Sequence, residues 1–158
     1  MISSRLSAAA ARAWKLLHGP AQWRILWLRH ATFMVGVTGV VLDDRNRVLL
    51  LKHRFWKDCP WGTPSGYLER GETVEAGFAR ELAEETGLAV RDVRVHAVNS
   101  GFRLRLEISV IGRLDGLAEP HVDGVEVEQA RFFDLDELPA GLRSSQRSVI
   151  EAAVRPEG

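Results

Sequence analysis

The stretch from Gly66 to Leu88, GYLERGETVEAGFARELAEETGL, constrains this chain most, because a glycine-rich turn runs directly into a short helix that carries carboxylates. Thr73 is a suitable N-cap for this helix, and Gly87 is a suitable left-handed residue to end it, so we expect a helix over residues 74–86. Gly77 is the only helix-breaking residue between the two caps. The acidic side chains of this segment therefore share one short scaffold.

Three of these residues, Glu81, Glu84 and Glu85, follow the spacing i, i+3, i+4, which places them on one face of the helix. Like charges repel at that spacing, and a bound cation would neutralise them. Phe78 and Leu82 lie close to them on the helical wheel, so the carboxylates border the buried side, where a charge must be paired or must bind a metal. Hard divalent cations such as Mg²⁺ or Mn²⁺ prefer oxygen ligands of this kind. A solvated acidic face is the alternative interpretation.

The same stretch resembles the signature box of the Nudix hydrolases. Gly66, five further residues, Glu72, seven further residues and then the run RELAEETGL from Arg80 to Leu88 match that box at every specified position. The resemblance covers the chain from about Thr32 to Pro139 more loosely. It implies the α/β class, as a mixed central sheet in an α/β/α sandwich. It also implies hydrolysis of a nucleoside diphosphate linked to another moiety, by water attack on phosphorus with divalent metal ions.

By match to the box, the resemblance implies roles for the charged residues of the motif and for its first glycine. The three helix glutamates are expected to bind Mg²⁺ or Mn²⁺, with Glu81 and Glu85 as the firmest ligands and the backbone at Gly66 as a further one. Arg80 is expected to orient the glutamates through hydrogen bonds, and Glu72 to brace the loop. For Arg80 and Glu72, a plain loop-to-helix salt bridge is the structural alternative.

Residues outside the box can add to the site. The family often takes a base or an extra ligand from a later glutamate, for which Glu126 is our first choice and Glu128 the second, although both could be exposed strand residues. Arg54 could meet phosphates, and Trp56 or Trp61 could stack on a base. A solvent-facing hairpin end and core packing are the corresponding structural alternatives.

The substrate is not identified by the sequence. Ser65 stands where the family has the middle glycine of a Pro-Gly-Gly turn. Position 103 is Arg where many ADP-ribose enzymes have Pro, Tyr67 is the only tyrosine, and the SQPWPFPxS run of the NADH enzymes is missing. These features count against three subfamilies and leave nucleoside triphosphates and other nucleotide conjugates open.

Two other functions compete with hydrolysis. A regulatory module of the same fold would bind a nucleotide without cutting it, but it has no need of a full carboxylate set. An isopentenyl diphosphate isomerase-like enzyme needs a catalytic cysteine, and Cys59 lacks the flanking residues of that family.

Composition limits the partners. The 158 residues carry 21 basic and 21 acidic side chains, so no overall charge points to nucleic acid. Residues 1–42 hold five basic and no acidic residues, which leaves 21 − 5 = 16 basic and 21 acidic residues in the remainder. The sequence contains no run of eighteen apolar residues, so it predicts no membrane-spanning helix. The single cysteine, Cys59, fits a reducing cytoplasm.

The sequence predicts an N-terminal helical extension over residues 1–30 and a Nudix hydrolase domain over residues 31–158. Apolar residues at helical spacing predict an amphipathic helix over Ser4–His18 that Gly19 and Pro20 end. Gln22–His30 could be helix or strand. A transit peptide and a lipid-binding helix are alternatives for the extension, but we expect it to pack on its own domain or to form a homodimer.

Within the domain, apolar alternation and turn residues predict strands and a closing helix. A hairpin is expected from Phe33–Leu42 and Arg47–His53, and further strands from Arg91–Asn99, Phe102–Gly112 and Glu126–Phe133. Ser100 and Gly101 are expected to form the turn between two of these strands. Ser144 or Ser145 is expected to cap the last helix.

Overall fold

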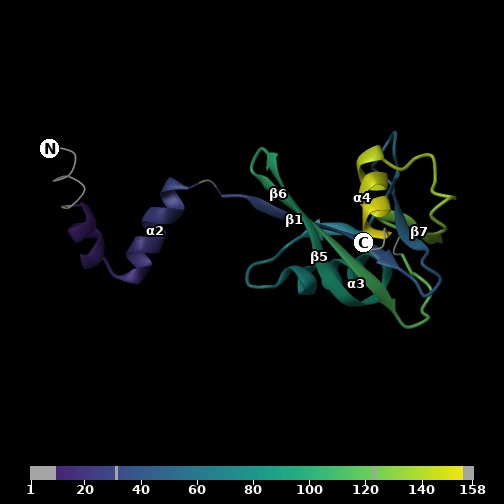
Figure 1. Cartoon of the computed structure of the whole chain (residues 1–158), viewed down its shortest axis with the longest axis horizontal. Coiled ribbons are helices and arrows are strands. Elements are labelled where there is room, and N and C mark those ends of the chain that lie inside the picture. Colours follow the sequence, from purple (N-terminus) through teal and green to yellow (C-terminus); the bar gives the residue numbers. More distant parts are fainter. Residues whose placement is uncertain (1–9, 31, 123, 155–158) are drawn as a thin grey trace. The chain divides into compact units, whose positions relative to one another are not determined.

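The computed structural model describes residues 10–30, 32–122 and 124–154. The chain divides into two compact units, with the boundary between Phe33 and Met34. In the first unit residues 10–16 are helical, and helix α2 covers Gly19–Arg29 (Figure 1). The first helix therefore ends just before Gly19, and Pro20 takes a place in the first turn of the next one. Residues 4–9 of the expected N-terminal helix lie outside the described residues.

The second unit is built on a seven-stranded mixed sheet. Its strands are β1 (Met34–Leu42), β2 (Val48–His53), β3 (Trp61–Gly62), β4 (Ser65–Tyr67), β5 (Ala89–Phe102), β6 (Arg105–Asp115) and β7 (Val127–Phe133). The order is β3-β2-β1-β6-β5, with β4 paired to β1 and β7 paired to β2. Strands β1 and β6 run parallel, while the other pairs are antiparallel (Figure 1).

Strands β1 and β2 separate soon after the turn that joins them. They pair at Leu42 and Val48, and further along β1 the short strand β4 takes over, pairing Ser65 with Thr38 and Gly66 with Val37. The hydrogen bonds that β2 does not make to β1 go to β3 and β7. This arrangement brings the Gly66 turn into the middle of the sheet.

The two helices of the second unit, α3 (Val74–Thr86) and α4 (Ser144–Val154), pack on opposite faces of the sheet. Alternate residues of β1 and β2 supply the two cores. On one face Val37, Val41, Leu49 and Leu51 pack with Phe78 and Leu82 of α3, and on the other Val40, Val48 and Leu50 pack with Ile150 of α4. This period-two division confirms the α/β/α sandwich.

The predicted turn at Ser100 and Gly101 is wrong. Strand β5 continues to Phe102, which pairs with Arg105, so the turn consists of Arg103 and Leu104, with Leu104 at φ 56°. Gly101 has φ 115° and lies where the register between β5 and β6 shifts. The glycine therefore serves a bulge in the strand, a role that sequence alone does not separate from a turn.

Strand β5 forms one edge of the sheet and is irregular along its length. Its register against β6 shifts between Arg91 and Arg94, between Val95 and Ala97, and again before Phe102. Asp92 adopts φ 54° in the first of these irregularities.

We predict that Gly39→Ala destabilises the second unit. A Cβ atom at this position in β1 would lie 2.1 Å from Cζ of Phe78, so the buried ring would have to move. Overpacking of this kind costs about 1–3 kcal/mol, which thermal or urea unfolding would detect. Gly19→Ala is the control, because nothing lies within 4 Å of a Cβ there. Equal unfolding midpoints for the two variants would contradict the packing of α3 on β1.

Candidate active site

Helix α3 forms where the sequence predicts it. Its N-cap Thr73 accepts a hydrogen bond from the Ala76 amide at 3.2 Å, and Gly87 ends it in the left-handed conformation with φ 69°. A Cβ atom at Gly77 would meet Leu68 Cδ2 at 2.4 Å. Gly77, the helix-weakening residue of the sequence, therefore allows the preceding loop to pack closely against the helix.

Strand β4 lies directly against Glu81. A Cβ atom at Gly66 would fall 1.9 Å from Cδ of Glu81, and the backbone amide of Tyr67 donates to Glu81 Oε1 at 3.1 Å. A side chain at position 66 would therefore displace this carboxylate. The departure from the family at Ser65 leaves this close approach intact, because it depends on Gly66.

The guanidinium of Arg80 gathers the acidic groups around it. It donates to both oxygens of Glu72, at 3.2 Å and 2.9 Å, and to the carbonyl of Tyr67 at 3.0 Å. It also lies 3.1 Å from Glu81 Oε1 and 3.3 Å from Glu84 Oε2. These bonds raise the pKa of Arg80 and lower the pKa of Glu72, for which the bond to Arg80 is the main cause. Arg80 thus orients carboxylates and joins loop to helix at once.

Glu85 is the least satisfied acid of the group. Its Oε2 atom is buried and has no hydrogen-bond partner among the described residues. Burial raises the pKa of Glu85 to about 8, with further contributions from the charges of Glu81 and Glu126, while a hydrogen bond from the Ser65 backbone opposes the shift. At neutral pH this carboxyl therefore holds its proton unless positive charge is supplied.

A cleft of about 340 Å³ opens over these groups. It is lined by Ser65, Gly66, Tyr67, Glu81, Glu84, Glu85, Glu126 and Val127. The fold thus brings Glu126, which directly precedes β7, to the glutamates of α3, forty or so positions earlier in the chain. Tyr67 and Val127 also line the cleft. The position of Tyr67 next to Gly66 was a signal for it, whereas no motif marks Val127.

The other predicted residues do not line this cleft. Arg54 donates to the Gly124 carbonyl at 2.6 Å. Trp56 stacks on His53 with ring centroids 4.0 Å apart, and Trp61 packs edge-on against Phe133. The stacking of Trp56 and the packing of Trp61 correspond to the structural alternative for each residue.

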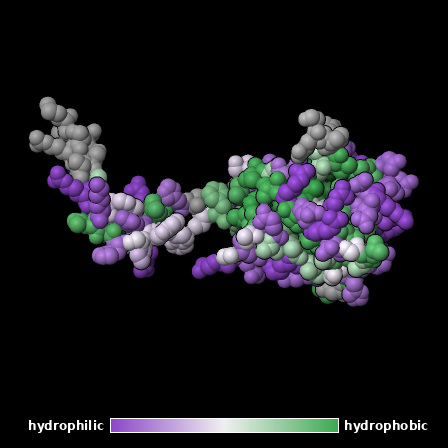
Figure 2. Space-filling view, turned by 60° about the horizontal axis from the view of Figure 1, so that its bottom comes forward, coloured by the Kyte–Doolittle hydropathy of each residue, from purple (hydrophilic) through white to green (hydrophobic). Residues whose placement is uncertain are grey.

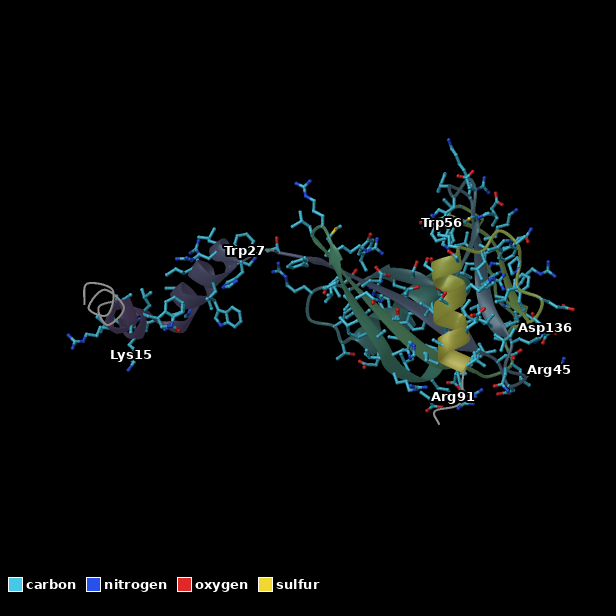
Figure 3. All side chains as sticks on the ribbon, turned by 45° about the horizontal axis from the view of Figure 1, so that its top comes forward. Lys15, Trp27, Arg45, Trp56, Arg91 and Asp136 are labelled. Carbon is cyan, nitrogen blue, oxygen red and sulfur yellow. The ribbon has the colours of Figure 1, made fainter. Side chains whose placement is uncertain are left out.

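A larger cleft of about 580 Å³ lies elsewhere on the second unit, between the turn after β1, the segment after β6 and strand β7. Its buried acid, Asp43, accepts hydrogen bonds from two backbone amides and from Arg47. Burial by itself would raise the pKa of Asp43, but these bonds together lower it below its ordinary value. Figure 3 labels Arg45, from this cleft, at the lower right of the unit and Trp56 at its upper right. The larger cleft contains none of the box residues.

The carboxylate cleft fits a hard divalent cation by its chemistry. It offers the unpartnered oxygen of Glu85, the further oxygens of three glutamates and a glycine backbone without a side chain in the way. In the described part of the chain, however, no three His, Cys, Asp or Glu side chains converge as an ion cage. Two of these glutamates, Glu81 and Glu84, are paired with Arg80.

Among the described residues, no helix has the length and apolar character needed to cross a bilayer.

Two curated relatives match most of this chain's length. The chain is 34% identical over 120 residues to an ADP-ribose pyrophosphatase of Methanocaldococcus jannaschii, covering 66% of this chain and 64% of that protein. It is 29% identical over 118 residues to the NAD-capped RNA hydrolase NudC of Vibrio parahaemolyticus, covering 73% of this chain and 45% of that protein. The chain thus spans less than two thirds of the length of either relative.

Comparison with solved structures also finds hydrolases. The MutT NUDIX hydrolase from Burkholderia pseudomallei superimposes with a TM-score of 0.63 at 26% identity, covering 77% of this chain and 98% of that one. The family model described as the NUDIX domain matches residues 32–153, which include strands β1 to β7, helix α3 and all of α4 but its last residue. With the carboxylate cleft formed by the signature box at its centre, the chain belongs to the NUDIX family.

Proposed function

We propose that the chain is a metal-dependent pyrophosphohydrolase, which cleaves a nucleoside diphosphate linked to another moiety by attack of water on phosphorus. One observation carries the proposal. The buried Oε2 of Glu85 has no partner, and it lies in a cleft whose charged residues, among those described, are all glutamates. Such a group of acids is destabilised by its own charge, so a cation and a phosphate that the cation attracts would complete it.

Glu81, Glu84 and Glu85 would hold Mg²⁺ or Mn²⁺, with the backbone at Gly66 as a further ligand. A bound divalent cation would supply positive charge for the diphosphate oxygens and lower the pKa of water. Glu85 must release its proton to act as a ligand, since its pKa is about 8 before any cation binds. Metal affinity should therefore rise with pH in the neutral range.

Arg80 and Glu126 have different tasks in this proposal. Arg80 fixes the carboxylates of Glu81 and Glu84 and so sets where a ligand can sit. Glu126 lines the cleft and is our choice for the base that accepts the proton of the attacking water. The reserve candidate, Glu128, is paired with Lys52 at 3.0 Å, which makes it the poorer proton acceptor.

The site itself supports only one part of the substrate, the diphosphate group. The relatives named for ADP-ribose and for NAD-capped RNA both act on compounds in which a nucleotide is linked through phosphate to a second group, and this supports a nucleotide conjugate. Nucleoside triphosphates remain in the proposal, because the residues that mark the ADP-ribose and NADH subfamilies are missing. A cytoplasmic location stays a prediction.

A second function, nucleotide binding without hydrolysis, is favoured by one observation. Arg80 already neutralises two of the three helix glutamates, and no ion cage is formed by the residues that the structure describes. A panel of nucleoside triphosphates and diphosphate conjugates, scored for products with and without Mg²⁺ or Mn²⁺, distinguishes the two. Metal-dependent product formation supports the hydrolase, while tight binding without any product supports the binding module.

We predict that Glu85→Gln lowers turnover by several orders of magnitude and leaves the fold intact. The amide keeps the size of the side chain but cannot neutralise a cation, which supplies much of the charge stabilisation in such reactions. Product formation at saturating Mg²⁺ measures the effect on the best substrate of the panel. Glu75→Gln is the matched control, because Glu75 is exposed in the first turn of the same helix. Wild-type rates in Glu85→Gln would contradict the assignment.

The pKa of Glu85 also predicts how stability depends on pH. Since it is raised from 4.5 to about 8, the folded chain keeps a proton that the unfolded chain releases between these values. The contribution of Glu85 to the free energy of unfolding therefore falls as pH rises through this window. Mg²⁺ binds the ionised form, so it should raise the melting temperature more at pH 8 than at pH 5.5.

Thermal melts of the wild type and Glu85→Gln across this range, with and without Mg²⁺, test this dependence. The variant should lose most of the pH slope and most of the Mg²⁺ effect. An unchanged slope in the variant would place the raised pKa on another group.

A further inference from the structure

The first unit, described by itself, has an inner and an outer side. Gln22 of α2 donates from Nε2 to the carbonyl of Trp14 at 2.9 Å. Trp14, Ala21 and Gln22 are half-buried, and no residue of α2 is fully buried. The start of α2 thus packs on the helix before it.

Three large apolar side chains of α2 are strongly exposed. Trp23, Trp27 and Leu28 are 74%, 66% and 75% exposed. At about 100° per residue the three fall within an arc of about 140°, with Arg24 between Trp27 and Leu28. Trp23 and Trp27 lie opposite Ala21 and Gln22, whereas Leu28 lies at the border of the arc, on the side of Ala21. Figure 3 shows Trp27 projecting from α2. Large apolar side chains grouped this way mark an interaction surface.

The charges of this unit all have one sign. Arg12, Lys15, Arg24 and Arg29 make no ion pair with any residue that the structure describes, and the first acidic residue of the chain is Asp43. The partner of this surface must therefore bring negative charge as well as an apolar layer.

We propose that the first unit binds to the surface of an anionic lipid bilayer. Trp23, Trp27 and Leu28 enter the boundary between headgroups and acyl chains, and the basic side chains lie against headgroup phosphates. Tryptophan favours this boundary because its ring is apolar and its indole N–H is polar. The helix lies on the membrane and does not span it, since it has only 11 residues.

Two other partners fit the surface less well. A symmetric dimer through this unit would place the same patch on both sides of the interface, so its basic groups would face one another without any acid. This argues against the homodimer expected from the sequence. A nucleic acid would neutralise the charges, but it would leave Leu28 without an apolar partner.

Vesicle co-sedimentation of the full chain tests the proposal. Vesicles of phosphatidylcholine with about one third phosphatidylglycerol should bind the chain at least about tenfold more tightly than vesicles of phosphatidylcholine alone, and salt should weaken this binding. The double variant Trp23→Ala, Trp27→Ala should bind about tenfold more weakly, and so should Arg24→Ala with Arg29→Ala.

Matched controls remove the same kinds of group from the second unit. Phe55→Ala deletes an aromatic residue that is 70% exposed, and Arg45→Ala deletes an exposed arginine. Both should bind like the wild type, and far-ultraviolet circular dichroism checks that each variant keeps its helices. Equal binding by all variants, equal binding to both kinds of vesicle, or no binding at all would overturn the proposal. Light scattering then reports whether a dimer that depends on Trp23 and Trp27 takes its place.

Discussion

The contact between Arg80 and the acids around it is the interaction on which the site depends. One guanidinium joins Glu72 in the loop, the Tyr67 carbonyl in β4 and two glutamates of α3. Arginine suits this task because its planar head donates in several directions at once. Without it, Glu72 and Glu81 would keep only backbone amide donors, and the Tyr67 carbonyl would lose this donor. Arg80 thus links the loop, β4 and α3 beside the cleft, and Gly66 lets β4 approach Glu81 closely.

The acids of the cleft are only partly compensated by basic groups. Arg80 compensates Glu81 and Glu84, but it makes no contact with Glu85, which burial and neighbouring carboxylates hold in the protonated form. Glu126, which directly precedes β7, adds negative charge to the same cleft. Glu85 keeps its proton at neutral pH because it has no base beside it, and the metal ion that we propose would take the place of that proton. In a purely structural ion-pair network, each acid would have its own base.

Much of the fold could be predicted because local signals agreed with the packing. The caps at Thr73 and Gly87 fixed the helix, and the alternating residues of β1 and β2 divide between two cores as their period requires. The turn after β5 was wrong because a glycine with positive φ serves a bulge as well as a turn. The helix at Gln22–His30 could not be separated from a strand, since its apolar residues surround it and give no clear period.

The candidate site was partly predictable for the same reason. Residues of the box come from one continuous stretch, so spacing alone places them together. Glu126 was predicted only because the family often takes a base or ligand from a later glutamate. Its position in the cleft depends on the pairing of β7 with β2. Arg54, Trp56 and Trp61 were proposed from residue type, which does not say which way a side chain points. Their contacts with Gly124, His53 and Phe133 depend on long-range packing.

The uneven course of β5 has a consequence for solubility. An edge strand of this length exposes backbone groups that could pair with a neighbouring molecule and begin an ordered aggregate. Its three shifts of register break the straight row of donors and acceptors, so an incoming strand would find only short matching segments. The bulge at Gly101 and the irregularity at Asp92 thus shorten the stretches of edge that a neighbouring molecule could pair with.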